Sequence, residues 1–283
     1  MVGSMRTLAA AVILAALVLA GCGGSDGSSS GADNATSPKL DPTAFAATDG
    51  RPNRFFPLTP GYQSVRQGGV NRGDRRLSHR SVVTVTDLTK KIAGIPAVVV
   101  LDQDFDGGEI AEQALDYYAQ DTRGNVWYLG SYTEAYEGGE FVNANDGWLA
   151  GKDDAEAGIM MPAGPKTGTP PFVQAVEPGD DPAVAKVTRT GARNCVPFKC
   201  YGDVVVVEED GSENKYYAPG VGGIRTEPVH KGGEEEVEEL VNLTQLSRAG
   251  LADISAEALR VDRHAAVTTR DVFGDAAPAQ RTG

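Results

Sequence analysis

The stretch from residue 81 to residue 226 alternates short apolar or β-branched runs with turn residues, at intervals of about 8 to 12 residues. Residues 81–86 (SVVTVT) alternate apolar and polar side chains, and residues 95–101 form a continuous apolar run. Glycine pairs within residues 106–109 and 137–140 are typical of tight hairpin turns, because glycine adopts positive φ without steric cost. Consecutive hairpins of this kind predict an antiparallel meander. Further strands are expected at residues 114–119, 126–130, 158–161, 172–176, 184–190, 203–207 and 215–218, and around Phe141 and Trp148.

The pattern becomes helical after residue 231. Residues 234–246 begin with acidic side chains, which favour a helix N-terminus, and Val237, Leu240 and Val241 fall on one helical face. A second helix is expected at residues 255–266, whereas residues 274–283 are expected to be a disordered tail. The predicted fold class is therefore mainly β, an antiparallel curved sheet or half-barrel with one or two C-terminal helices.

The N-terminus has the three parts of an export signal: Arg6, an apolar run over residues 8–19, and small residues before Cys22. The apolar run is shorter than the roughly 20 residues that a membrane-spanning helix needs. Residues 19–22 (LAGC) resemble the bacterial lipobox, in which the cysteine receives a lipid that holds the protein to a membrane. An ordinary signal peptide with an accidental cysteine is the alternative. We expect an exported protein, anchored to a bacterial membrane through lipid on Cys22.

This reading divides the chain into five parts. Residues 1–21 are the lipoprotein signal peptide, and residues 22–53 are rich in small and polar side chains that cannot form a core, so they are expected to be a disordered tether. A β-rich domain follows at residues 54–227, then a helical extension at residues 228–273 and the tail. The length beyond the tether suffices for one large core or two small ones, and we favour one.

The net charge excludes some classes of partner, and the cysteines suggest a disulfide. The formal net charge is -13, which argues against nucleic acid or anionic lipid headgroups as partners, because both attract basic surfaces. Cys195 and Cys200 are separated by four residues, and in an oxidising compartment such a pair is expected to form a disulfide. Two free thiols are the alternative. A zinc site would need further cysteine or histidine ligands at suitable spacing, and none is near.

Motifs for catalysis or metal binding are incomplete. Residues 102–107 (DQDFDG) copy the first half of a calcium loop, but the twelfth position is Gln113 where a glutamate is needed, so we interpret the aspartates as strand residues on one face. The three histidines, His79, His230 and His264, lie outside any nucleophile or zinc-protease motif. The sequence therefore predicts no enzyme, no metal and no cofactor.

Aromatic residues concentrate in the predicted sheet. Tyr117, Trp127, Trp148 and Tyr217 are candidates for an apolar ligand-binding surface on the concave face of a curved sheet. The alternative is that these large rings pack the core or pair across strands. The sequence leaves both interpretations open.

The chain contains six short motifs at residues 55–58 (FFPL), 117–121 (YYAQD), 124–128 (GNVWY), 159–162 (IMMP), 164–168 (GPKTG) and 215–222 (KYYAPGVG). Together these motifs resemble those of a group of uncharacterised bacterial lipoproteins, over about residues 55–227. They are also similar to β-rich periplasmic domains of the lipoprotein-carrier (LolA-like) kind. That resemblance implies a curved antiparallel sheet around an apolar cavity with helices as a lid, and lipid binding in some members, but no catalytic residue.

The leading hypothesis is a non-enzymatic envelope lipoprotein whose β domain binds or carries an apolar ligand, such as a lipid or an acyl chain. It requires a pocket beneath the helix. The alternative is a structural or protein-interaction lipoprotein without a ligand pocket, whose partner is unknown, and solid packing around Trp127 and Trp148 would favour it. An enzyme of unrecognised type would require polar groups clustered in a cleft.

Overall fold

The computed structural model describes residues 35–45, 51–72, 75–145, 147–230 and 236–282. The expected export signal, Cys22 and most of the expected tether lie outside the described residues. The strands are β1 (Tyr62–Arg72), β2 (Arg75–Ile92), β3 (Ile95–Asp106), β4 (Glu109–Gln120), β5 (Val126–Glu137), β6 (Glu140–Asn143), β7 (Gly147–Leu149), β8 (Glu156–Met161), β9 (Phe172–Val176), β10 (Ala183–Cys195), β11 (Cys200–Glu209), β12 (Glu213–Ala218), β13 (Gly222–Pro228), β14 (Glu236–Gln245) and β15 (Gln280–Arg281).

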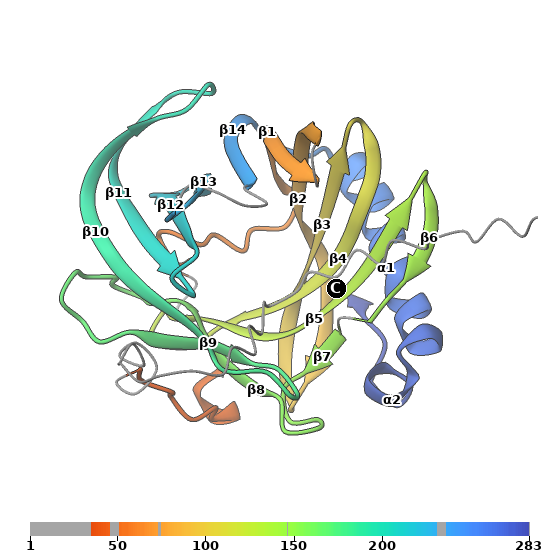
Figure 1. Cartoon of the computed structure of the whole chain (residues 1–283). Helices are drawn as coiled ribbons and strands as arrows, with labels where there is room; N and C mark the ends of the chain where they lie inside the picture. Colours follow the sequence, from red (N-terminus) through yellow and green to blue (C-terminus); the bar gives the residue numbers. More distant parts are fainter. Residues whose placement is uncertain (1–34, 46–50, 73–74, 146, 231–235, 283) are drawn as a thin grey trace, which may run out of the picture. The chain divides into compact units, whose positions relative to one another are not determined.

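Twelve of the strands in the described ranges form a closed antiparallel barrel (Figure 1). The order runs β2-β3-β4-β5-β8-β9-β10-β11-β12-β13-β14-β1, and β1 pairs with both β14 and β2, which closes the ring. The strands β6 and β7 pair only with β5, and β15 pairs with β2. The expected curved antiparallel sheet is thus confirmed in its class, but it is closed where we expected a half-barrel.

The two glycine-pair turns occur where the sequence predicts them. Gly107 (φ +62°) and Gly108 (φ +93°) connect β3 to β4, and Gly138 (φ +58°) and Gly139 (φ +78°) connect β5 to β6. Two consecutive residues with positive φ make the turn whose twist matches that of the flanking strands. The local sequence is therefore sufficient to fix these hairpins.

The helix expected at residues 234–246 is wrong, because β14 occupies this position and completes the barrel. Buried side chains follow a strand period here, since Glu238 and Leu240 are buried while their neighbours are less so. The buried carboxylate of Glu238 pairs with Arg66, at 3.0 Å between Oε1 and Nη1, which offsets the cost of burying its charge. The barrel therefore extends to Gln245, beyond the domain boundary that we expected at residue 227.

The second expected helix is confirmed and is longer than predicted. The helix α1 (Arg248–Thr268) begins after Ser247, whose hydroxyl accepts a hydrogen bond from the backbone N–H of Gly250, and a short α2 (Arg270–Phe273) follows. Buried Ala258, Val261 and Ala265 share one core cluster with outward residues of β3 and β4 such as Leu101 and Leu115. In the described ranges, no helix has both the length and the apolar character that crossing a membrane requires.

The expected disordered tail is wrong within the described residues. Gln280 and Arg281 pair with Thr89 and Leu88 of β2, and the backbone N–H of buried Ala279 donates to Asp262 Oδ2 at 2.9 Å. The tail is ordered by backbone pairing and by one buried carboxylate, features that composition alone does not reveal.

Part of the expected tether also contacts the barrel. The ring of Phe45, which ends the short helix Pro42–Phe45, lies edge-on to Trp127 at 5.9 Å between centroids. Thr36 forms a parallel bridge with Phe172. The tether prediction is therefore wrong for these described residues.

The expected disulfide is confirmed. Cys195 ends β10 and Cys200 begins β11, and the two residues are directly paired across this hairpin with their Cα atoms 3.9 Å apart.

Candidate functional site

A cavity of about 400 Å³ lies inside the barrel. Its wall is built from strands all around the ring, including β1 to β5 and β8 to β13, and from residues 56–58 that precede β1. On β3 and β4 the cavity-lining residues are Val100, Asp102, Asp116 and Tyr118, which alternate with the residues that face α1. The helix therefore covers the outer face of the barrel, and the cavity is not beneath it (Figure 1). The expected lid of helices over the cavity is wrong.

The segment from Asn53 to Leu58 forms one side of the cavity through Phe56, Pro57 and Leu58. Asn53 is buried, and its Oδ1 accepts hydrogen bonds from the backbone N–H groups of Phe55 and Phe56 at 2.9 and 3.0 Å. An asparagine that bonds the backbone two residues later makes a tight turn, and here the turn directs Phe56 toward the cavity.

Two of the motifs named above, residues 55–58 and 215–222, contact each other at this side of the cavity. The backbone N–H of Gly220 donates to Arg54 O at 2.7 Å, and a Cβ on Gly222 would lie 3.5 Å from Pro57 Cδ. Gly222 has φ +91°, a conformation that side-chain-bearing residues rarely adopt. The two segments are distant in sequence, and the fold joins them at the cavity wall.

Four of the five aromatic rings that line the cavity lie close to one another. Phe56 lies edge-on to Tyr118 at 4.9 Å between centroids, and Tyr118 stacks on Tyr128 at 4.9 Å. Tyr217 lies 6.4 Å from Phe56 on the other side. Burial raises the pKa of both Tyr118 and Tyr128 well above the ordinary tyrosine value, so both hydroxyls stay protonated and can donate hydrogen bonds.

Asp116 places a carboxylate beside these rings. Its Oδ1 accepts hydrogen bonds from Tyr128 Oη at 2.7 Å and from Ser131 Oγ at 3.0 Å. Burial raises the pKa of the Asp116 carboxyl above its ordinary value, and the hydrogen bonds from Tyr128 and Ser131 act in the opposite direction. The site thus holds an acid whose charge is poorly solvated and is stabilised by hydroxyl groups.

A second polar group lies across the cavity. Glu209 accepts a hydrogen bond from Gln174 Nε2 at 3.1 Å and forms an ion pair with Lys215, with 2.8 Å between Oε2 and Nζ. The negative charge of Glu209 raises the pKa of Lys215 well above its ordinary value, while burial acts against it. Lys215 is therefore a permanently charged residue that is already paired.

Further along the barrel interior, polar residues continue in a connected group. Ser81 Oγ donates to Glu238 Oε2 at 2.6 Å, and His79 Nδ1 lies 2.8 Å from Asp106 Oδ1. Arg72 also pairs with Asp106, at 2.9 Å. Among the described residues, no group of histidine, cysteine and acidic side chains has a metal-holding arrangement. We read these contacts as internal pairs that hold β1, β2, β3 and β14 together.

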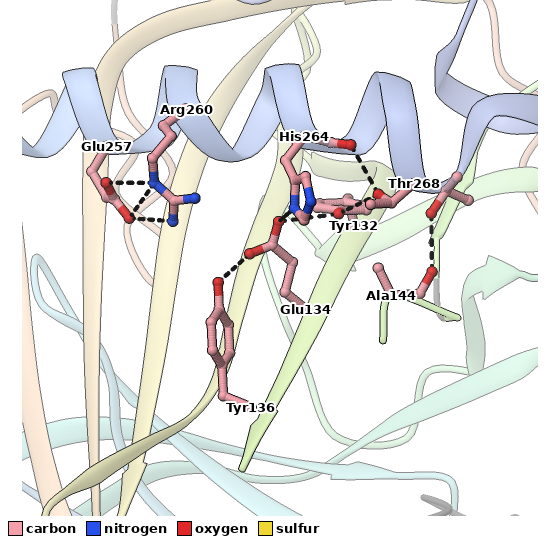
Figure 2. A network of polar contacts seen from close by, with 9 residues as sticks. Tyr132, Glu134, Tyr136, Ala144, Glu257, Arg260, His264 and Thr268 are labelled. Carbon is pink, nitrogen blue, oxygen red and sulfur yellow. Dashed lines mark hydrogen bonds and ion pairs between the residues drawn. The ribbon is translucent and has the colours of Figure 1, made fainter. Parts of the chain in front are cut away.

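A separate polar network joins α1 to the outside of the barrel (Figure 2). Glu134 is fully buried and accepts hydrogen bonds from Tyr132 and Tyr136, and its Oε1 lies 2.6 Å from His264 Nδ1. Burial raises the pKa of Tyr136 to about 12, so this hydroxyl remains a donor. The contacts of His264 with Glu134 and of Thr268 with Tyr132 join the helix to β5, and none of these four residues lines the cavity described above. We therefore do not treat it as a reaction centre.

Of the four predicted ligand-binding residues, Tyr217 lines the cavity and the other three do not. Tyr117 points to the opposite face and packs near Phe273, Trp127 donates from Nε1 to Asp121 at 3.0 Å, and Trp148 packs against Tyr128 from outside the lining. All three are almost fully buried. Sequence reasoning missed the lining residues Phe56, Asp102, Asp116, Tyr118, Tyr128 and Lys215.

A partial signal for these residues exists in the strand period. Adjacent aromatic pairs such as Tyr117–Tyr118 and Trp127–Tyr128 must point to opposite faces of the sheet. One member of each pair lines the cavity, but the sequence does not indicate which face is the inner one. The lipidation site, Cys22, lies outside the described residues.

No protein family matches this sequence, and no curated protein matches it. Among solved structures, a candidate lipoprotein from Parabacteroides distasonis ATCC 8503 has 15% sequence identity and a TM-score of 0.36, covering 69% of this chain and 100% of that one. A candidate exported protein with a YmcC-like fold from Bacteroides fragilis NCTC 9343 has 14% identity and a TM-score of 0.34, covering 68% and 99% of the two chains. At this low similarity, neither protein assigns a family or a function to this chain.

Proposed function

We propose that this protein is an exported, lipid-anchored envelope protein whose barrel binds a small ligand in its interior and catalyses no reaction. The observation that carries the proposal is the cavity of about 400 Å³ within the closed barrel, lined by aromatic and charged side chains. Its volume falls in the lower part of the range of roughly 300–1,000 Å³ found for small-molecule sites. Such a site suits a compact molecule rather than a whole two-chain phospholipid.

The lining favours a ligand with both an apolar and a polar part. Val83, Val85, Val100 and Met160 supply apolar surface, whereas Asp116 and Lys215 supply charge. A purely hydrocarbon ligand would place apolar surface against these groups and offer them no polar contact beyond their protein partners, which disfavours its binding. A single acyl chain fits this description only if its polar group meets the charged part of the wall.

Export and anchoring rest on the sequence. The apolar run at residues 8–19 followed by Cys22 supports passage across a membrane and attachment of a lipid. The disulfide between Cys195 and Cys200 agrees with an oxidising compartment.

A second function, that of a structural or protein-interaction lipoprotein, is favoured by one observation. Trp127 and Trp148 are 1% and 2% exposed, so the region around them is solid core. In that case the barrel would be a scaffold and the cavity a packing defect.

The two functions are separated by two measurements on residues 23–283 produced without the lipid anchor. Small molecules extracted from natively purified protein are identified by mass spectrometry, and binding of the uncharged fluorescent probe N-phenyl-1-naphthylamine is titrated. Ala183 lines the cavity, so Ala183→Phe should place a bulky ring in it. Ala256→Phe, on the exposed face of α1, is the matched control. Probe binding that Ala183→Phe abolishes and Ala256→Phe preserves would support the ligand site. Absence of both co-purified ligand and probe binding would favour the scaffold.

A further inference from the structure

Part of the β10–β11 hairpin has a charge opposite to that of the whole chain. The protein has a formal net charge of -13, but residues 183–202, which we call the basic arm, contain no acidic side chain. The hairpin is the long teal arm in Figure 1, and its loop, residues 196–199, is closed by the disulfide. The basic arm carries four basic side chains, all exposed: Lys186, Arg189, Arg193 and Lys199.

Acidic side chains that flank the loop already have basic partners. Asp203 follows the basic arm in β11 and pairs with Arg54 at 2.8 Å. The loop also contacts β14, because the backbone N–H of Phe198 donates to a carbonyl of that strand at 3.1 Å. In β14, Glu239 pairs with Arg225 at 3.0 Å. These carboxylates are therefore engaged with cations outside the basic arm.

Two cations at the loop keep their charge available. Among the described residues, neither Arg193 nor Lys199 forms an ion pair. The Nζ of Lys199 lies 4.9 Å from the centre of the Tyr201 ring and 5.9 Å from that of Phe198, a contact that leaves its charge unneutralised. Exposed cations without a counter-charge attract anionic surfaces.

An exposed apolar side chain accompanies these charges. Phe198 is 38% exposed, and the adjacent Pro197 is exposed as well. A ring beside cations suits the interface of an anionic membrane, because the ring can enter the boundary between headgroups and acyl chains while the cations contact the headgroups. The loop thus combines the two kinds of side chain that such an interface binds.

The fold holds the loop in this arrangement. Val196 and Tyr201, on either side of Phe198 in the chain, are buried in a small cluster with Ile224 of β13 and Leu240 of β14. Phe198 is outside this cluster. The disulfide joins the two strands at the base of the loop. A surface that is ordered before binding loses less conformational entropy when it binds.

We infer that the loop of the basic arm is a membrane-contact site for anionic lipid, with Phe198 inserted at the headgroup level and Arg193 and Lys199 against the headgroups. It rests on the anchoring part of the proposed function, which holds the protein at a membrane, and not on the cavity. For the basic arm alone, it revises the expectation that the net charge excludes anionic headgroups. An acidic polypeptide would match the cations, but it would leave the exposure of Phe198 unexplained.

The test is flotation of residues 23–283, without the lipid anchor, with vesicles of phosphatidylcholine or of an equimolar mixture with phosphatidylglycerol. We expect binding to the anionic vesicles that added salt weakens by screening. Arg193→Gln and Lys199→Gln should each weaken it by about fivefold, the usual effect of one basic residue at an anionic surface. Phe198→Ser should weaken it by about tenfold, because it removes the inserted apolar surface.

Two matched controls remove the same chemical groups elsewhere. Lys91→Gln changes an exposed lysine at the end of β2, and Phe141→Ser changes a phenylalanine of β6 that is 40% exposed. Both should bind the anionic vesicles as the unchanged protein does. The Tm of every variant is compared with that of the unchanged protein, so that a loss of binding through unfolding is recognised.

Three results would overturn the inference: equal binding to the two kinds of vesicle, binding to neither, or equal losses in the loop and control variants. If the protein bound polyglutamate but no vesicle, its partner would be an acidic polypeptide instead. Vesicle binding requires neither the cavity nor the lipid on Cys22. Its failure would therefore leave the proposed function intact, and absence of naphthylamine binding would not count against the membrane contact.

Discussion

The ion pair between Lys90 and Asp262 should be a main determinant of stability. Lys90 and Asp262 side chains are 2% and 3% exposed, with 2.7 Å between Nζ and Oδ1. Lys90 Nζ also donates to Ala277 O at 2.9 Å, and Asp262 Oδ2 accepts from the backbone N–H of Ala279. The pair therefore ties β2, α1 and the C-terminal segment together.

Asp262→Asn keeps an acceptor for Ala279 but leaves the buried ammonium of Lys90 without a counter-charge. Removing one partner of a buried ion pair costs about 3–5 kcal/mol, a large fraction of the roughly 5–15 kcal/mol that stabilises a typical domain. With a urea dependence of about 2–3 kcal/mol per molar, the unfolding midpoint should fall by about 1–2 M. The matched control, Asp253→Asn, changes an exposed residue of the same helix and should leave the midpoint unchanged.

The double variant Lys90→Met with Asp262→Asn removes the uncompensated charge and should recover about half of the lost stability. Hydrogen exchange should show the amides of residues 277–282 opening first in Asp262→Asn, because these residues depend on the pair for their position. Equal midpoints for Asp262→Asn and Asp253→Asn would refute the reasoning, as would a double variant that is no more stable than Asp262→Asn.

Two further predictions concern the disulfide and a buried carboxylate. Reducing the Cys195–Cys200 bond opens a short loop and should cost about 2 kcal/mol, seen as a fall in Tm of about 4–8 °C, whereas an unchanged Tm would mean that the hairpin alone fixes this loop. Although burial acts to raise it, the pKa of Asp121 lies below its ordinary value of 3.8 because Trp127, Asn125 and Arg123 donate hydrogen bonds to the ionised form. Its contribution to stability is therefore complete above the ordinary value and is lost as the pH falls through the lowered pKa, so Asp121→Asn should flatten the acid unfolding curve below about pH 4. Parallel acid curves for the two proteins would contradict this assignment.

Those parts of the fold that depend on neighbouring residues, such as tight turns and the C-terminal helix, can be predicted from the sequence. The glycine pairs at residues 107–108 and 138–139 fix their hairpins because no other residue adopts two consecutive positive φ angles so easily. Helix α1 was found because its apolar residues recur at helical spacing. Closure of the barrel was missed, because it depends on pairing between β1 and β14, which no local signal reports.

Residue 238 shows why β14 was mistaken for a helix. A strand with one buried face normally places apolar side chains at every second position, but here Glu238 takes such a position and pairs with Arg66. The remaining apolar residues, Val237, Leu240 and Val241, then match a helical spacing. For the same reason the cavity was only partly predicted: its charged residues are inward strand positions, and inward polar residues are indistinguishable in sequence from outward ones.

The pairing of β1 with β14 has a consequence for how the protein folds. Tyr62 lies opposite Gln245, so the ring closes between its first and last strands in chain order. A chain that folds as it emerges can form the hairpins of β2 to β5 early, because they pair with sequence neighbours, but the joining edges stay open until β14 arrives. Such distant pairing is slow, and an open strand edge is prone to pair with other chains. The interior cavity is therefore complete only once β14 has joined β1, and it belongs to the whole ring rather than to any one hairpin.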